Sequence, residues 1–128
     1  MSGFPEKGTR EWVVRAIQNE EGKPGDISFI FCNDAYLLQL NEQYLQHDTL
    51  TDIITFDYCE ETGLVSGDVF ISLDRVRENA IELNLSFDEE LKRVIIHGVL
   101  HLLGYKDKEP ADEALMRQKE NYYLTLQA

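Results

Sequence analysis

The stretch from Ser86 to Gly104 constrains the fold more than any other part of this sequence. Ser86 and Glu89 have the spacing of a capping box, in which each side chain accepts a hydrogen bond from the backbone N–H of the other residue at the start of a helix. Apolar residues then recur at helical spacing as far as Leu103, and Gly104 suits the left-handed conformation that often ends a helix. The sequence therefore predicts a long apolar helix between these two signals, at the centre of the fold.

Weaker patterns on both sides of this helix predict the remaining elements. Further helices are expected over residues 10–19, from Asn33 or Asp34 to Leu45, over 74–83 and over 110–125, with strands over 27–32, 52–58 and 68–72 and a loop over 60–67. The helical side chains expected to face inward are Trp12, Val13, Ala16, Ile17, Val76, Ala80, Leu83, Leu115, Met116, Tyr122 and Tyr123. These elements predict one α+β domain over residues 1–128, in which a small mixed sheet is packed with about five helices.

Four positions separate His97 from His101 on the predicted central helix, so both imidazoles lie on one face about one turn apart. A helix offers two nitrogens to one metal ion at this spacing. Asp107 follows Gly104 by three residues, and in metzincin-type zinc sites a glycine at this offset turns the chain so that a third ligand reaches the metal. Three protein ligands with an open fourth position are typical of catalytic zinc. The alternative of two core histidines bonded to the backbone stays open.

The residue after the first histidine argues against a protease. Zinc proteases with such a helix have a glutamate there as general base, whereas this chain has Gly98, which has no side chain to take a proton. Hydrolysis of another kind of bond remains open, because a metal ion lowers the pKa of water. Gly98 also allows another part of the molecule to approach the helix closely.

The sequence H-G-V-L-H-L-L-G-Y, from His97 to Tyr105, closely resembles the signature of the YbeY-type endoribonuclease family of bacterial rRNA maturation factors. Further segments follow the family in order. Residues 40–48 resemble its L-N-x-x-Y segment, residues 51–56 its P-T-D-V-L-S-F strand, and residues 67–69 its G-D-I strand. The resemblance spans about residues 27–120 and implies a metal-dependent hydrolase of single-stranded RNA, acting in ribosome maturation and quality control with zinc held in a cleft.

The resemblance also implies the metal ligands, with one departure. Asp107 stands where the family usually has a third histidine as the last ligand. A carboxylate is an acceptable zinc ligand, and its negative charge favours harder metals such as manganese or magnesium. We therefore expect one ion per chain, zinc with manganese or magnesium as alternatives, held by His97, His101 and Asp107, which are also the expected catalytic residues.

A second departure concerns the phosphate. Leu45 stands where the family usually has an arginine suited to holding the scissile phosphate, so that guanidinium is missing. His47 at the family's neighbouring lysine position, and Lys106 and Lys108 on either side of Asp107, are the expected phosphate contacts. His47 could equally be a solvated residue at the end of a helix. Other basic residues are interpreted as surface charges; these are Arg75, Arg77, Lys92 and Arg93.

Charge limits the expected partners. The net charge is −12, and residues 26–70 contain nine acidic residues and no lysine or arginine. Because counterion release rewards positive charge, we expect weak binding to free RNA, with single-stranded rRNA brought in by a ribosomal or ribosome-assembly protein that docks on this acidic segment. The sequence has no signal peptide and no apolar run long enough for a membrane span, and Cys32 and Cys59 have no CxxC spacing, so we expect a cytoplasmic protein without membrane contact.

Two other functions remain open at this point. The chain could be a ribosome-assembly binding factor with a largely structural metal and little nuclease activity, which the missing arginine and the acidic segment favour. A hydrolase of another small substrate is the third possibility.

Overall fold

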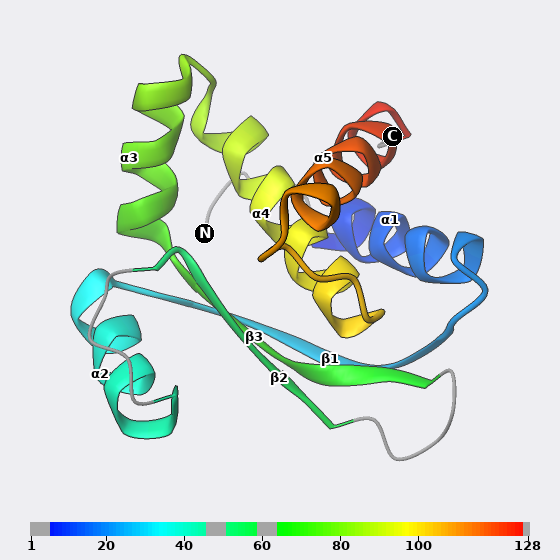
Figure 1. The fold of residues 1–128 in the computed structure, drawn as a ribbon, viewed down its shortest axis with the longest axis horizontal. Coiled ribbons are helices and arrows are strands. Elements are labelled where there is room, and N and C mark those ends of the chain that lie inside the picture. The colour runs from blue at the N-terminus through cyan, green and yellow to red at the C-terminus, as the bar shows by residue number, and fades with distance from the viewer. Residues whose placement is uncertain (1–5, 46–50, 59–63, 127–128) are drawn as a thin grey trace.

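A three-stranded mixed sheet lies between four helices on one face and one helix on the other (Figure 1). The computed structural model describes residues 6–45, 51–58 and 64–126. The described elements are α1 (Glu6–Asn19), β1 (Lys23–Cys32), α2 (Asp34–Leu45), β2 (Ile53–Asp57), β3 (Leu64–Ser72), α3 (Leu73–Leu83), α4 (Phe87–Leu102) and α5 (Pro110–Thr125). The predicted α+β class, with its small mixed sheet and five helices, is confirmed.

Strand β3 is the centre of the sheet. It pairs in parallel with β1 and antiparallel with β2, so the spatial order is β1-β3-β2. Val69 of β3 lies opposite Phe29 on one side and Thr55 on the other, and it is fully buried. The alternation of buried and partly exposed residues along β3 is the pattern of a strand that directs every second side chain into the core.

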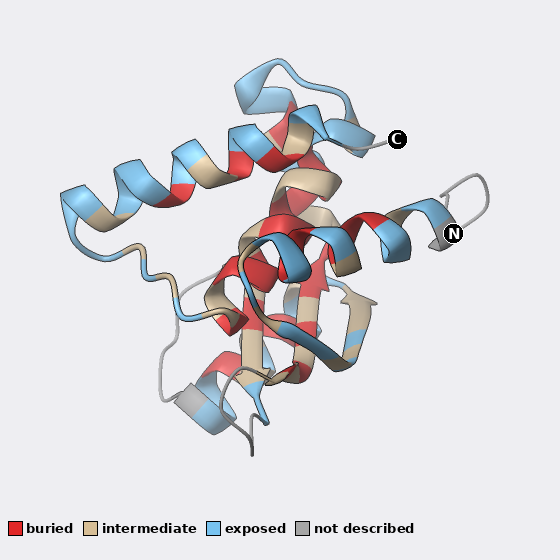
Figure 2. Ribbon diagram, turned by 90° about the vertical axis from the view of Figure 1, so that its right-hand side faces the viewer, coloured by how far each residue is buried: buried red, intermediate tan, exposed pale blue. Residues whose placement is uncertain are grey.

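Helix α4 lies at the centre of the fold, as its sequence predicts. Its capping box is present, with Ser86 Oγ accepting from the Glu89 N–H at 3.1 Å and Glu89 Oε1 accepting from the Ser86 N–H at 3.0 Å. Buried residues gather along α4, on the sheet and on the facing sides of α1 and α5 (Figure 2). Helix α4 packs against β2 and β3, and its two histidines are partly exposed.

Gly98 is where α4 approaches the sheet most closely. A Cβ atom at this position would lie 2.7 Å from Ile53 Cδ1 and 2.9 Å from Val69 Cγ1, both closer than van der Waals contact allows. The missing side chain is therefore a packing requirement. It confirms that another part of the molecule approaches the helix at this residue.

Helices α1 and α5 pack against α4 and against each other. All four predicted inward residues of α1 are buried: Trp12, Val13, Ala16 and Ile17. The indole N–H of Trp12 donates to the backbone carbonyl of Tyr123 at 2.8 Å, which joins the two helices inside the core. None of the described helices is long and apolar enough to cross a membrane.

Some boundaries and facings differ from the prediction. β1 begins at Lys23 and β3 at Leu64, four residues before the predicted starts at 27 and 68, so residues 64–67 of the predicted loop belong to a strand. These two strand starts pair with each other across an irregularity in the register, and this long-range pairing has no local sequence signal. α1 begins four residues before the predicted start.

Three helical side chains predicted to face inward are instead exposed: Leu83, Leu115 and Tyr122. The neighbours Met116 and Tyr123 take the inward positions of α5, and Leu83 lies in the last turn of α3, beyond the buried Val76 and Ala80. The inward facing of Val76, Ala80, Met116 and Tyr123 is confirmed.

Candidate metal centre

The three predicted ligands meet at the end of α4. Gly104 has a φ of 107°, which confirms the left-handed turn, and the chain then brings Asp107 back toward the helix. His97 Nε2 lies 3.0 Å from His101 Nε2 and 3.2 Å from Asp107 Oδ2, and His101 Nε2 lies 3.4 Å from the same oxygen. The sequence thus predicted a real cluster of possible ligand atoms.

The hydrogen bonds of the two Nδ1 atoms determine whether the Nε2 atoms can bind a metal ion. His101 Nδ1 lies 3.0 Å from the backbone carbonyl of Tyr105, which only accepts, so Nδ1 carries the proton of the neutral ring. His97 Nδ1 lies 2.6 Å from Oε2 of Glu120 and carries the proton in the same way. Both Nε2 atoms therefore present lone pairs toward each other and toward the Asp107 carboxylate. Three acceptors facing one point repel one another unless a cation lies between them.

The spacing of these atoms fits a metal ion. Four ligands placed about 2.0–2.1 Å from a tetrahedral zinc lie about 3.3–3.4 Å from one another. The three separations between ligand atoms, 3.0, 3.2 and 3.4 Å, are close to this value. His97, His101 and Asp107 could therefore hold a metal ion, with room for a non-protein ligand, because the Asp107 side chain is 38% exposed.

Glu120 is a functional residue that the sequence did not reveal. It lies on α5, is almost fully buried, and accepts from His97 while Arg93 Nη1 and Arg117 Nη1 lie 3.2 and 3.3 Å from its Oε1. Burial raises the pKa of Glu120, but the hydrogen bond from His97 and the charges of Arg93 and Arg117 outweigh burial, so the pKa lies below its ordinary value. A carboxylate that orients a histidine and increases its basicity is typical of metal sites.

Arg93 was predicted to be a surface charge, and this is wrong. Its side chain is only 14% exposed, and it joins Glu120 to a second buried carboxylate, Glu90. Arg93 Nε donates to Glu90 Oε1 at 2.7 Å, and Nη2 donates to Glu90 Oε2. Two buried carboxylates need a buried cation, and the helical spacing of Glu90 and Arg93 was the available signal.

The predicted phosphate contacts are only partly described. Lys106 and Lys108 are exposed on either side of Asp107, near the candidate ligands along the chain. His47 and the side chain of Leu45 lie outside the part that the structure describes. Arg117, which the prediction did not include, lines the cavity beside the cluster.

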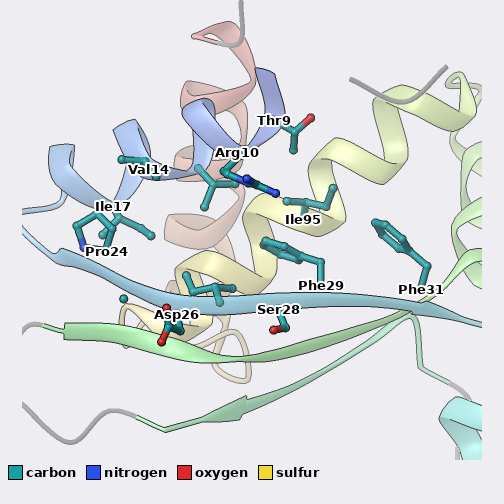
Figure 3. Close-up of a pocket in the computed structure, with 13 residues that line it drawn as sticks. Thr9, Arg10, Val14, Ile17, Pro24, Asp26, Ser28, Phe29, Phe31 and Ile95 are labelled. Atoms are coloured by element: carbon teal, nitrogen blue, oxygen red, sulfur yellow. The ribbon is translucent and has the colours of Figure 1, made fainter. Parts of the chain in front are cut away.

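Two cavities help to locate the site. One of about 450 Å³ adjoins the cluster and is lined by His97, Asp107, Arg93, Arg117, Glu120 and neighbouring residues of α5. A larger one of about 690 Å³ lies between α1, β1 and α4, where Val14, Phe29 and Ile95 surround it and Arg10 and Asp26 are the charged residues (Figure 3). The smaller cavity, in contrast, is lined by two of the candidate metal ligands, His97 and Asp107.

Known proteins resemble this chain in sequence and in fold over most of its length. A family model described as Endoribonuclease YbeY matches residues 4–127. The chain is 56% identical over 115 residues to a protein of Flavobacterium psychrophilum named Endoribonuclease YbeY, covering 90% of this chain and 81% of that protein. It is 47% identical over 126 residues to a Bacteroides thetaiotaomicron protein of the same name, covering 98% and 91%. The fold is similar to the solution structure of a Thermotoga maritima protein, with a TM-score of 0.67 and 31% identity, covering 96% and 83% of the two chains.

Proposed function

The chain belongs to the YbeY endoribonuclease family, and on this premise we propose that it acts as a single metal-dependent endoribonuclease domain on single-stranded regions of rRNA, in rRNA maturation and ribosome quality control. The observation that supports a metal-dependent reaction is the meeting of His97 Nε2, His101 Nε2 and Asp107 Oδ2 within 3.0–3.4 Å. The hydrogen bonds at both Nδ1 atoms leave these Nε2 atoms free to act as ligands.

His97, His101 and Asp107 would hold one ion per chain and act as the catalytic residues. Two imidazoles suit zinc, and the carboxylate makes manganese or magnesium the alternatives. A bound divalent cation supplies a Lewis acid that lowers the pKa of water and stabilises charge on a phosphoryl oxygen. Glu120 orients His97, and the backbone carbonyl of Tyr105 orients His101.

The phosphate needs cations from the chain itself, because the family's arginine is replaced by Leu45. Lys106 and Lys108 are exposed beside Asp107 and support this role, and His47 stays a prediction. Arg117 is a further contact: its side chain is 58% exposed, and its Nη1 is bonded to Glu120 at 3.3 Å. Arg93, in contrast, has Nε, Nη1 and Nη2 all engaged by buried carboxylates.

A protein partner would bring the substrate. Residues 26–70 contain nine carboxylates and no lysine or arginine, which disfavours tight binding to free RNA and suits a basic ribosomal or ribosome-assembly protein. A role in rRNA maturation would place the protein in the cytoplasm. The proposal therefore expects weak affinity for naked RNA, measured by titration of a labelled single strand at several salt concentrations.

The test of the proposed function is cleavage of single-stranded RNA by metal-loaded protein and by His101→Ala and Asp107→Ala. Both variants should lose cleavage, because each removes a ligand, while Glu82→Ala, which changes an exposed residue of α3, should keep it. Metal-independent cleavage, or full activity in both ligand variants, would show that the proposal is wrong.

The acidic segment and the loss of arginine at Leu45 also favour a second function, a ribosome-assembly binding factor with a structural metal. That function predicts co-sedimentation with pre-ribosomal particles, no turnover on RNA, and a lower melting temperature after metal removal, since a ligand that binds only the folded state stabilises it. Cleavage of RNA by the loaded protein, absent from the ligand variants, would exclude it.

A further inference from the structure

Tyr105 contacts the candidate metal centre through its backbone and the rest of the molecule through its side chain. Its carbonyl oxygen accepts from His101 Nδ1 at 3.0 Å, while its hydroxyl donates to Oε1 of Glu20 at the end of α1. The residue lies between Gly104, where the chain turns, and Asp107, the third candidate ligand. A displacement of Tyr105 would therefore move both the partner of His101 and the segment that carries Asp107.

Glu20 is held firmly enough to serve as an anchor. Its side chain is 10% exposed, and Lys119 of α5 donates to its Oε2 at 3.0 Å. Tyr123, also on α5, donates its hydroxyl to the same oxygen, and Asn19 donates to that hydroxyl at 3.0 Å. Hydrogen bonds to an ionised carboxylate are roughly twice as strong as neutral ones. The Glu20 carboxylate thus joins α1, α5 and the segment after α4.

The segment after α4 is also attached by backbone hydrogen bonds and by packing of the Tyr105 ring against the core. The N–H of Gly104 donates to the His101 carbonyl and the N–H of Tyr105 to the Leu100 carbonyl, both at 3.0 Å, which fixes only the first residues after the helix. The ammonium of Lys119 lies 5.6 Å from the centre of the Tyr105 ring, so the same lysine holds both partners of the hydrogen bond. The hydroxyl of Tyr105 is the contact that links this segment to Glu20.

We propose that Tyr105 is a positioning residue for the metal centre: Glu20 holds its hydroxyl so that its carbonyl fixes the ring orientation and tautomer of His101. This inference rests on the proposed function, because it requires that His101 binds a metal. Partners that orient a ligating histidine in this way typically change metal affinity by about 10- to 100-fold when they are removed. Loss of the Tyr105 hydroxyl loosens the carbonyl without removing it, so the lower end of this range is expected.

Tyr123 provides a matched control. Its hydroxyl donates to the same carboxylate, but Tyr123 makes no contact with His101 that the described structure contains. Tyr105→Phe and Tyr123→Phe each remove one oxygen atom and one hydrogen bond to Glu20. Tyr123→Phe also removes the hydrogen bond from Asn19, so it should lower the free energy of unfolding at least as much as Tyr105→Phe does, and only Tyr105→Phe should change the metal centre.

The experiment is a zinc titration of metal-stripped, folded protein by calorimetry, combined with the absorption spectrum of the cobalt-loaded form, which reports ligand geometry. Tyr105→Phe should weaken zinc binding by about tenfold and shift the cobalt spectrum, whereas Tyr123→Phe should stay within about twofold of the wild type. Glu20→Gln should weaken zinc binding in the same direction, and it replaces Tyr105→Phe if that variant does not fold.

The outcomes separate this inference from the proposed function. Equal zinc affinity in Tyr105→Phe and Tyr123→Phe, with tight binding in the wild type and loss in His101→Ala, overturns the positioning role alone. No zinc binding by the wild type overturns both the positioning role and the metal-dependent function.

Discussion

His97 Nδ1 and Glu120 Oε2 are 2.6 Å apart, so a carboxylate of α5 that is almost fully removed from solvent fixes the tautomer of a histidine of α4. The bond joins two helices at the candidate metal centre, and it keeps the proton on Nδ1 and the lone pair on Nε2. Glu120 therefore prepares His97 to bind a cation.

Glu120→Gln should weaken zinc binding by about tenfold, because the amide still accepts from His97 but no longer supplies the negative charge that increases the basicity of the ring. Calorimetric titration of stripped protein measures the change. Glu113→Gln is the control, since Glu113 is an exposed carboxylate on the same helix and lines the same cavity. Equal affinities in all three proteins would contradict the role given to Glu120.

Arg93→Met should lower the free energy of unfolding by about 3–5 kcal/mol, because it removes the arginine paired with the buried Glu90 and one of the two arginines paired with the buried Glu120. Urea denaturation at neutral pH measures this loss. Arg77→Met removes an arginine that is 61% exposed and paired with Asp74, and it should cost at most about 1 kcal/mol. Similar losses in both variants would mean that the Glu90–Arg93–Glu120 network is not a buried ionic unit.

Gly98→Ala should destabilise the protein by about 1–2 kcal/mol. The added methyl group meets Ile53 and Val69, and overpacking of this kind costs about 1–3 kcal/mol, from which the better helix propensity of alanine subtracts up to about 1 kcal/mol. Thermal and urea denaturation measure the net effect. A more stable Gly98→Ala would show that α4 and the sheet are less closely packed than described.

The central helix and the three candidate ligands could be predicted because their signals are local. The capping box of Ser86, the stop at Gly104 and the offset of Asp107 each depend on residues only a few positions apart. Such features depend on local backbone geometry and not on contacts between distant parts of the chain. The predicted cluster of His97, His101 and Asp107 is confirmed as a possible metal site for the same reason.

The parts that the sequence did not reveal depend on distant contacts. Glu120 is 23 residues from His97, and nothing in its neighbourhood on α5 marks it as buried. The early start of β3 results from pairing with Lys23 and Pro24, two residues that locally resemble a turn. Leu115 and Tyr122 face solvent because the rotation of α5 is set by contact with α1 and α4, and an adjacent apolar residue takes each inward position.

The anchor at Glu20 should make stability depend on pH in acid. Burial raises the pKa of Glu20, but hydrogen bonds from Tyr105, Tyr123 and Lys119 outweigh burial and place the pKa below its ordinary value. Because the folded-state pKa lies below the unfolded-state value, the stabilisation is complete above the unfolded-state pKa of about 4.5 and disappears as pH falls through the folded-state pKa.

Glu20→Gln cannot titrate at this position, so the wild type should be more stable than the variant at pH 7, and the difference should shrink as pH falls below about 4.5. Urea denaturation of both proteins between about pH 3 and pH 7, a range that includes the titration of carboxylates, measures the difference. A difference that stays constant over this range would contradict the ionised anchor.

The most direct test of metal-dependent RNA cleavage is a single titration in which zinc is added to metal-stripped protein while cleavage of a single-stranded RNA is followed. Cleavage should be absent at the start, rise in proportion to bound zinc, and reach its plateau at one ion per chain. Full cleavage before any zinc is added, or zinc bound at one ion per chain without cleavage of RNA, would contradict the account.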